Sequence, residues 1–165
     1  MPYIIAQIFG TMAIVSSLII YSRKTKDQLI FFKSLQDLFW VAHYLLISAY
    51  SAAATNGLCF VREFVFSHIK NKKYDKILLA VFLCLYLLSA CFTWKNIFSI
   101  FPAVSSSVST VAFWVKNPRS TKKLSIVAAS CTLLYNIMLA QSVSVYVGVA
   151  FTICTSVFSL LKKEQ

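Results

Sequence analysis

The sequence predicts an all-α membrane protein in which seven transmembrane helices form two three-helix bundles joined by a linker helix, a 3+1+3 arrangement. Residues of the set AVILMFWYC make up 59% of its 165 residues and charged residues only 13%, against about 45–50% and about 25% in soluble domains. A globule of this size cannot bury so much apolar surface. Lipid is therefore the expected solvent.

Seven apolar runs are long enough to cross the roughly 30 Å hydrocarbon core of a bilayer. Charges and turn residues mark where each run stops. Helices are expected, because backbone groups in lipid must be satisfied within their own segment and the runs lack the alternation of membrane barrel strands. The predicted spans cover residues 3–21, 29–48, 52–69, 77–93, 97–115, 124–140 and 143–161.

The placement of positive charge supports this count and predicts the topology. With seven spans, the first, third and fifth connections share one side of the membrane with the C-terminus. Because cytoplasmic segments retain Lys and Arg, we expect the C-terminus in the cytoplasm and the N-terminus outside. Thirteen of the 16 basic residues fall on that side: Arg23, Lys24, Lys26, Lys70, Lys72, Lys73, Lys76, Lys116, Arg119, Lys122, Lys123, Lys162 and Lys163.

The connections also predict two related three-helix units, residues 1–70 and 96–165, on either side of a linker helix in residues 71–95. Long basic connections follow the first and fifth spans, and short uncharged turns follow the second and sixth. A shift of 93 positions places Ser51 over Ser144 and Lys70 over Lys163. One extra helix between the units makes them parallel repeats within a single membrane domain.

Polar residues in the second span recur at spacings of three and four, so they form one stripe that must face protein or water. Lys33 is expected to extend toward the cytoplasmic surface, with Asp37 one turn further along as a partner. The stripe consists of Lys33, Gln36, Asp37, Trp40, His43 and Tyr44.

Arg62 in the third span lies at a depth similar to that of Asp37, which predicts an ion pair between them. An unpaired charge in mid-membrane costs about 2.5–3.5 kcal/mol on insertion scales. Three interpretations stay open: a salt bridge that locks the first bundle, the lining of a polar cavity, or a proton relay through Asp37, Glu63 or His43.

The second unit offers small neutral polar groups, and its mid-span amide Asn136 is the strongest candidate for a solute contact. Small residues along the last two spans favour close helix packing. Pro102 and Gly10 are predicted hinges, because each would interrupt its helix at roughly matching places in the two units, and a kink that serves packing is the alternative. The candidate cavity residues are Trp40, His43, Asn56, Arg62 and Asn136.

No catalytic signature is present, so we expect no enzyme, no cofactor and no metal site. The chain lacks HExxH, GxSxG and P-loop motifs, and its five cysteines lie in apolar runs without CxxC spacing. The net charge of +11 is placed for membrane topology rather than for nucleic acid. The expected partners are the lipid bilayer and a small polar solute, and a homo-oligomer is left open.

Several short stretches resemble the YgjV family of bacterial inner-membrane proteins over nearly the whole chain. They are His43 to Leu46, Tyr50 to Ala54 with Arg62, Tyr135-Asn136 and Gln141-Ser142. That family is similar in turn to the SWEET and PQ-loop (MtN3-like) carriers, which share two three-helix bundles and an extra helix. The resemblance implies a SWEET-like fold with an internal repeat in the bacterial inner membrane. The chain departs from these carriers in lacking a Pro-Gln pair.

Two functions are consistent with these observations. The first is a small carrier that moves a small polar solute by alternating access around a central cavity. The second is a membrane scaffold or assembly partner that does not transport, in which the buried polar residues serve packing. A polar cavity at mid-membrane that exposes His43 and Asn136 distinguishes the carrier from the scaffold.

Overall fold

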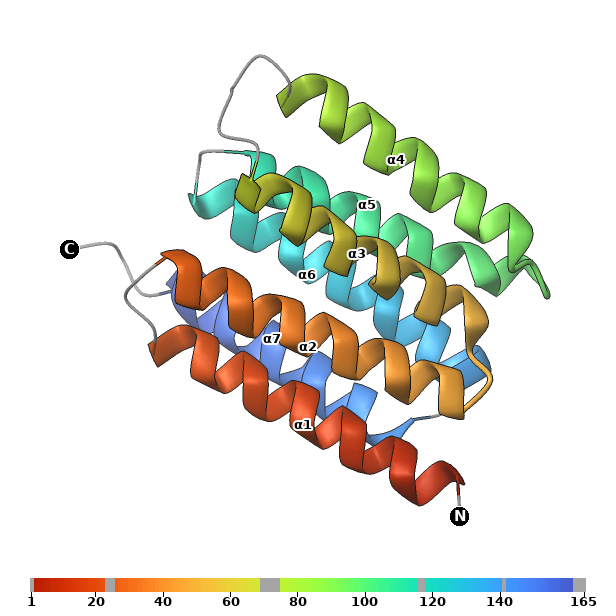
Figure 1. The fold of residues 1–165 in the computed structure, drawn as a ribbon. Coiled ribbons are helices and arrows are strands. Elements are labelled where there is room, and N and C mark those ends of the chain that lie inside the picture. Colours follow the sequence, from red (N-terminus) through yellow and green to blue (C-terminus); the bar gives the residue numbers. More distant parts are fainter. Residues whose placement is uncertain (1, 23–25, 69–74, 116–117, 141, 162–165) are drawn as a thin grey trace.

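The computed structural model describes residues 2–22, 26–68, 75–115, 118–140 and 142–161. All regular structure in these ranges is helical (Figure 1), which agrees with the predicted all-α class and its seven helices. A short 3-10 helix, η2, precedes α5, and a π-helix, η3, follows α6. The elements are α1 Pro2–Ser22, α2 Lys26–Leu46, α3 Tyr50–His68, α4 Asp75–Phe92, η2 Ile97–Ile100, α5 Phe101–Trp114, α6 Pro118–Tyr135, η3 Asn136–Ala140 and α7 Val143–Leu161.

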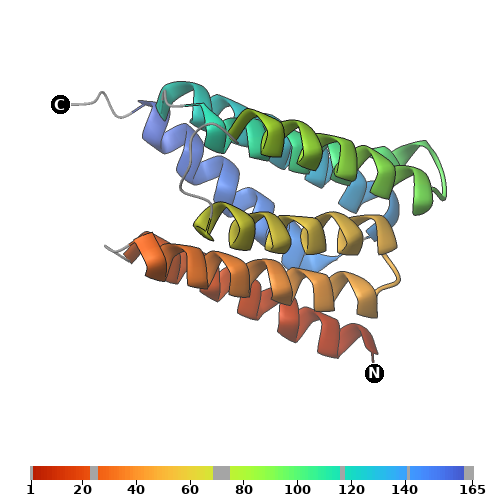
Figure 2. The same cartoon turned by 45° about the horizontal axis from the view of Figure 1, so that its top comes forward.

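The helices lie side by side, and each packs chiefly on its neighbours in sequence. The main contacts join α1 to α2, α2 to α3, α5 to α6 and α6 to α7. Helix α4 packs on α3 and α5, and Figure 1 shows it at the outer edge of the bundle. Further contacts of α1 with α7 and of α3 with α5 join the two halves of the chain. The two views in Figures 1 and 2 show that α4 stands apart from α1 and α7.

The helix ends fall into two sets at opposite ends of the bundle. Figure 1 shows the ends of α1, α3, α5 and α7 beside the starts of α2, α4 and α6. The connections that carry most of the predicted basic clusters, in residues 23–25, 69–74, 116–117 and 162–165, lie outside the described residues. The sidedness of the termini therefore stays a prediction.

The surface of the bundle is apolar and the interior is built from small residues. Phe92 is 86% exposed and Phe158 69%. A water-soluble monomer rarely exposes such contiguous apolar area, whereas helices in lipid pack through small side chains. The buried alanines include Ala6, Ala13, Ala52, Ala53, Ala103, Ala112, Ala128 and Ala129. Further exposed apolar residues include Ile4, Ile8, Phe31, Phe64, Ile77, Ile97 and Val143.

Length and hydropathy together single out α1 among the described helices. Its segment Pro2–Ile19 is long and apolar enough to cross a membrane. Four other apolar stretches are shorter, namely Lys76–Phe92, Ile97–Ala112, Lys123–Leu139 and Val143–Phe158. The prediction that all seven helices span the bilayer thus has direct support in α1, and for the other helices it stays a prediction.

Both predicted hinges have a different role in the structure. Helix α1 continues unbroken through Gly10, where an added Cβ would lie only 2.1 Å from Ser144 Oγ. Gly10 therefore serves close packing in place of the predicted interruption. Pro102 lies in the first turn of α5, where a missing N–H leaves no helical hydrogen bond unmade. The change in backbone geometry falls before it, where the 3-10 helix η2 meets α5 at Phe101.

Candidate functional site

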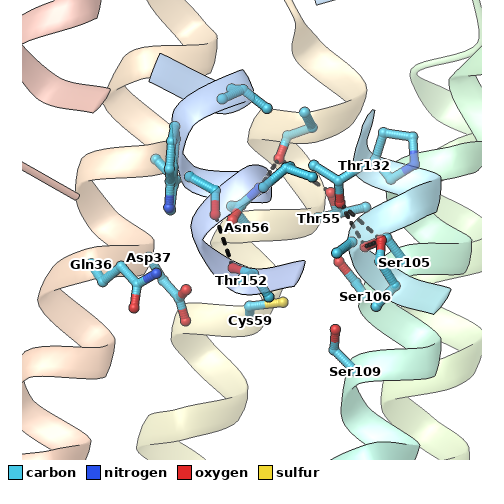
Figure 3. A pocket seen from close by; sticks show the side chains of 18 of the residues that line it. Gln36, Asp37, Thr55, Asn56, Cys59, Ser105, Ser106, Ser109, Thr132 and Thr152 are labelled. Atoms are coloured by element: carbon cyan, nitrogen blue, oxygen red, sulfur yellow. Dashed lines mark hydrogen bonds between the residues drawn. The ribbon is translucent and has the colours of Figure 1, made fainter. Parts of the chain in front are cut away.

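A cavity of about 580 Å³, lined by both polar and apolar side chains, lies between the two halves of the bundle. Its walls come from α1, α2, α3, α5, α6 and α7, and among the described residues α4 contributes none. The volume falls within the range of about 300–1,000 Å³ typical of small-molecule sites. Figure 3 shows side chains from both halves converging on this space.

The described charged side chains of the cavity wall all come from α2 and α3, and they form two ion pairs. Lys33 Nζ lies 2.8 Å from Asp37 Oδ1, one helical turn away. Arg62 donates from Nη2 to Glu63 Oε1, its neighbour on α3. The predicted direct pair of Asp37 with Arg62 is therefore replaced by two pairs, each within one helix. All four charged residues line the same cavity, but each forms its ion pair with a residue on its own helix.

Arg62 is a buried junction between three helices. Its Nη1 donates to Thr110 Oγ1 on α5 and, at 3.5 Å, to Tyr86 Oη on α4. Tyr86 is fully buried and also lies 3.5 Å from Cys59 Sγ. Arg62 thus borders the cavity and at the same time ties α3 to the edge helix α4 and to the second half of the chain.

Asp37 is the less satisfied of the two carboxylates. Its side chain is only 4% exposed, and Oδ1 is engaged by Lys33. Its other oxygen, Oδ2, is buried and has no hydrogen-bond partner among the described residues. Buried polar atoms are nearly always paired, so this oxygen needs a physical explanation.

The wall across from Asp37 is made of hydroxyl groups. Ser105 Oγ donates to Ala128 O at 2.8 Å and lies 2.8 Å from Thr132 Oγ1. Ser106 and Ser109 project from α5 toward the same space (Figure 3). Small neutral polar groups were expected in the second half, but these α5 serines were not among the predicted site residues. Their signal was the cluster of serines directly after Pro102, inside an apolar run.

Three of the five predicted cavity residues, Trp40, Asn56 and Arg62, line the cavity. Trp40 stacks on Tyr44 with ring centroids 5.7 Å apart. Asn56 donates from Nδ2 to Ala52 O at 2.8 Å. Aromatic and amide groups thus complete a mixed polar and apolar lining.

His43 and Asn136, the other two predicted cavity residues, are fully buried and are not part of the cavity wall. His43 Nδ1 lies 2.7 Å from Ala6 O and Nε2 lies 2.8 Å from Ser142 Oγ. Because a carbonyl only accepts, Nδ1 carries the proton and Nε2 accepts from Ser142. Asn136 Nδ2 donates to Ser142 O at 3.0 Å, and Ser142 N donates to Asn136 Oδ1 at 2.8 Å.

Gln7 and Ser144 extend this group, so that the end of the bundle nearest Pro2 is closed by hydrogen bonds. Ser144 donates to Gln7 Oε1 from its backbone N at 2.9 Å and from its Oγ at 2.7 Å. We call the group of Gln7, His43, Asn136, Ser142 and Ser144 the outer network, because it lies at the N-terminal end of the bundle, which is predicted to face outside. It joins α1, α2, α7 and the π-helix η3, and it requires the close approach that Gly10 permits.

An apolar exterior, an interior of small residues and a polar cavity between helices define a helical integral membrane protein. A family model named Imp-YgjV, described as a bacterial inner membrane protein, matches residues 4–165. The chain therefore belongs to the Imp-YgjV family of bacterial inner membrane proteins. This confirms the family resemblance and the bacterial inner membrane as its location. Neither the comparison with curated proteins nor that with solved structures gave a match.

Proposed function

We propose that the protein is a carrier that moves a small polar solute across the bacterial inner membrane by alternating access. The observation that carries this proposal is the cavity of about 580 Å³ whose walls come from six helices, three from each half of the chain. In a 3+1+3 arrangement, α1 to α3 and α5 to α7 are the two units that move, and α4 is the linker. A solute site between two repeats is the usual arrangement in carriers of this kind.

The position of the cavity along the helices suits a closed outer end. On α2 the cavity wall runs from Lys33 to Tyr44, about 16 Å along the axis at about 1.5 Å per residue. The outer network lies at the Tyr44 end of the cavity, where His43 is hydrogen-bonded to Ser142. At the other end the wall reaches Lys33 and Glu63, near the helix ends that join the basic connections. We take this to be the conformation closed to the outside.

Alternating access then requires the outer network to separate and the opposite helix ends to approach. The network is suited to such a change, because its hydrogen bonds join α1 and α2 to α7, across the two proposed units. Two conformations that differ in a few hydrogen bonds lie close enough in free energy for a solute to shift their populations.

A non-transporting scaffold is the second candidate, and one observation favours it. His43 and Asn136, the two polar residues expected to contact a solute, both form internal hydrogen bonds instead. In a scaffold the cavity would have no occupant during function. The carrier proposal depends instead on residues that line the cavity.

Flux into liposomes distinguishes the two candidates. The purified protein is reconstituted in phosphatidylethanolamine–phosphatidylglycerol vesicles, and uptake of labelled amino acids, sugars, organic acids and nucleosides is measured. Ser109→Phe fills the cavity, and Ser130→Phe places the same bulk on the exposed face of α6 as a matched control. The carrier predicts uptake that Ser109→Phe abolishes and Ser130→Phe retains. Uptake equal to that of protein-free vesicles for every solute class contradicts it.

A further inference from the structure

Asp37 belongs to the cavity wall and has one unused hydrogen-bond acceptor. Lys33 Nζ occupies Oδ1 at 2.8 Å, while Oδ2 is buried without a partner among the described residues. Leaving a buried carboxylate oxygen unpaired costs more free energy than leaving a neutral acceptor unpaired. A hydrogen-bond donor at Oδ2 would offset this cost, and Asp37 belongs to the wall of the cavity in which a solute would lie.

Two unused donors lie on the facing wall. Ser106 and Ser109 on α5 line the cavity, and Figure 3 shows them across from Gln36 and Asp37. Within the described part of the chain neither hydroxyl has a hydrogen-bond partner, whereas the hydroxyls of Ser105 and Thr132 bond to each other. A hydroxyl donates well to an anionic oxygen. The cavity thus offers an acceptor on one side and donors on the other.

The charges of the wall favour a solute without net charge. Lys33 with Asp37, and Arg62 with Glu63, form two ion pairs whose charges cancel. A solute with net charge would place an uncompensated charge among helices whose own charges already cancel, which is costly. A zwitterion keeps the balance and still carries one cationic donor and one anionic acceptor.

Trp40 adds a surface that suits an ammonium group. It lies three positions after Asp37 on α2, lines the same cavity and stacks on Tyr44 at 5.7 Å. An indole face near a cation contributes a favourable cation–π interaction. Carboxylate and indole therefore favour a cationic nitrogen at the same side of the cavity.

We propose that the cavity binds a small zwitterion of the amino-acid class, with its primary ammonium group on Asp37 Oδ2 and its carboxylate on Ser106 and Ser109. This inference rests on the proposed function, since it names the solute class of the same site. Lys33 Nζ already donates to Oδ1, so Oδ2 is the carboxylate oxygen left for the ammonium group.

Calorimetric binding to the wild-type protein in detergent tests the ligand chemistry first. The ligands are the standard neutral amino acids, each compared with its deaminated carboxylic acid and with its N-trimethylated betaine, which keeps both charges but has no N–H donor. We expect at least one amino acid to bind. Both of its analogues are expected to bind at least about tenfold more weakly, which is the effect of losing one charge-assisted hydrogen bond. Absence of binding for every amino acid, or equal affinity for either analogue, overturns the proposal.

Variants then test the residues. Asp37→Asn keeps the size of the side chain and removes its charge, so affinity is expected to fall about tenfold or more. Asp75→Asn makes the same chemical change on α4, which contributes no described residue to the cavity wall, and is expected to bind as the wild type does. Ser106→Ala combined with Ser109→Ala is expected to weaken binding as well. Wild-type affinity in Asp37→Asn overturns the assignment, and if that variant does not fold the ligand series decides alone.

Failure of this inference is distinguishable from failure of the proposed function. Amino-acid binding that depends on Asp37, without uptake into liposomes, upholds the site and contradicts the carrier. Uptake of an uncharged solute that Asp37→Asn leaves unchanged upholds the carrier and overturns the zwitterion site.

Discussion

His43 Nε2 lies 2.8 Å from Ser142 Oγ, although 99 positions separate the two residues in the chain. Both side chains are fully buried, and Ser142 lies between the π-helix η3 and α7. This bond joins the first and last thirds of the sequence at the end of the bundle nearest Pro2. It makes His43 a structural residue of the outer network rather than a wall of the cavity.

Replacing His43 by Ala should destabilise the fold. The substitution removes two buried hydrogen bonds, to Ala6 O and Ser142 Oγ, at about 0.5–1.5 kcal/mol each, and leaves space where a fully buried side chain was packed. Thermal unfolding in detergent, followed by circular dichroism, measures the loss as a lower Tm. Ser130→Ala removes an exposed hydroxyl bonded to Ile126 O within its own helix, and should change stability by less than about 0.5 kcal/mol. A His43→Ala protein as stable as Ser130→Ala would show that the outer network contributes nothing.

Gly10 should tolerate no side chain while Ser144 is present. A Cβ on Gly10 would lie 2.1 Å from Ser144 Oγ and 2.6 Å from Ser144 Cβ, so α1 and α7 must separate. Gly10→Ala is expected to lower stability by about 1–3 kcal/mol, the usual cost of overpacking. Adding Ser144→Gly removes the clash and should recover part of that loss.

Gly57→Ala is the matched control for this change. At Gly57 the nearest heavy atom to an added Cβ is 3.9 Å away, in Val41, which is ordinary contact. Because alanine favours helix by about 0.5–1 kcal/mol over glycine, Gly57→Ala should keep or raise Tm. If Gly10→Ala and Gly57→Ala shift Tm equally, the close approach of α1 and α7 is not what requires Gly10.

Arg62 and Glu63 should show strong coupling in a double-mutant cycle. Removing one partner of a buried ion pair costs about 3–5 kcal/mol, largely because the other charge is left uncompensated. Glu63 is partly exposed at 18%, so the loss for Arg62→Leu should lie toward the lower end. Arg62→Leu with Glu63→Gln should then be more stable than Arg62→Leu alone. Unfolding by denaturant measures the cycle, and strict additivity would mean that Thr110 and Tyr86, not Glu63, are the partners that matter.

Helix positions followed from the sequence, but some of the helix ends did not. The predicted span 143–161 coincides with α7 Val143–Leu161. Helix α6 begins at Pro118, six positions before the predicted span, because Lys and Arg mark the edge of hydrocarbon and do not end a helix. The last part of that span is the π-helix η3, whose wider turn brings Asn136 to Ser142. Hydrophobic periodicity contains no information about such a bond.

The sequence predicted several residues that lie close together around the candidate site. It did not predict which of them form ion pairs or hydrogen bonds with one another. Matching depth on antiparallel helices placed Trp40, Asn56 and Arg62 around one space, and they line the cavity. Depth alone does not choose between Lys33 and Arg62 as the partner of Asp37, because that choice depends on side-chain rotamers. Nor does it reveal that His43 lies beyond the wall, since this follows from the tertiary contact with Ser142.

The orientation in the membrane can be tested by labelling single cysteines with a membrane-impermeant maleimide. The five native cysteines are first replaced by alanine or serine, and Lys24→Cys, Lys72→Cys or Lys95→Cys is then introduced. Because cytoplasmic segments retain cations, Lys24 and Lys72 are expected to be protected in intact cells and labelled only after permeabilisation. Lys95 lies exposed between α4 and η2, at the opposite end of the bundle, and is expected to be labelled in intact cells. Labelling of Lys24→Cys and Lys72→Cys from opposite sides would show that the basic connections do not share one side of the membrane. The charge argument for seven spans, and the assignment of the outer network to the outer end, would then be wrong.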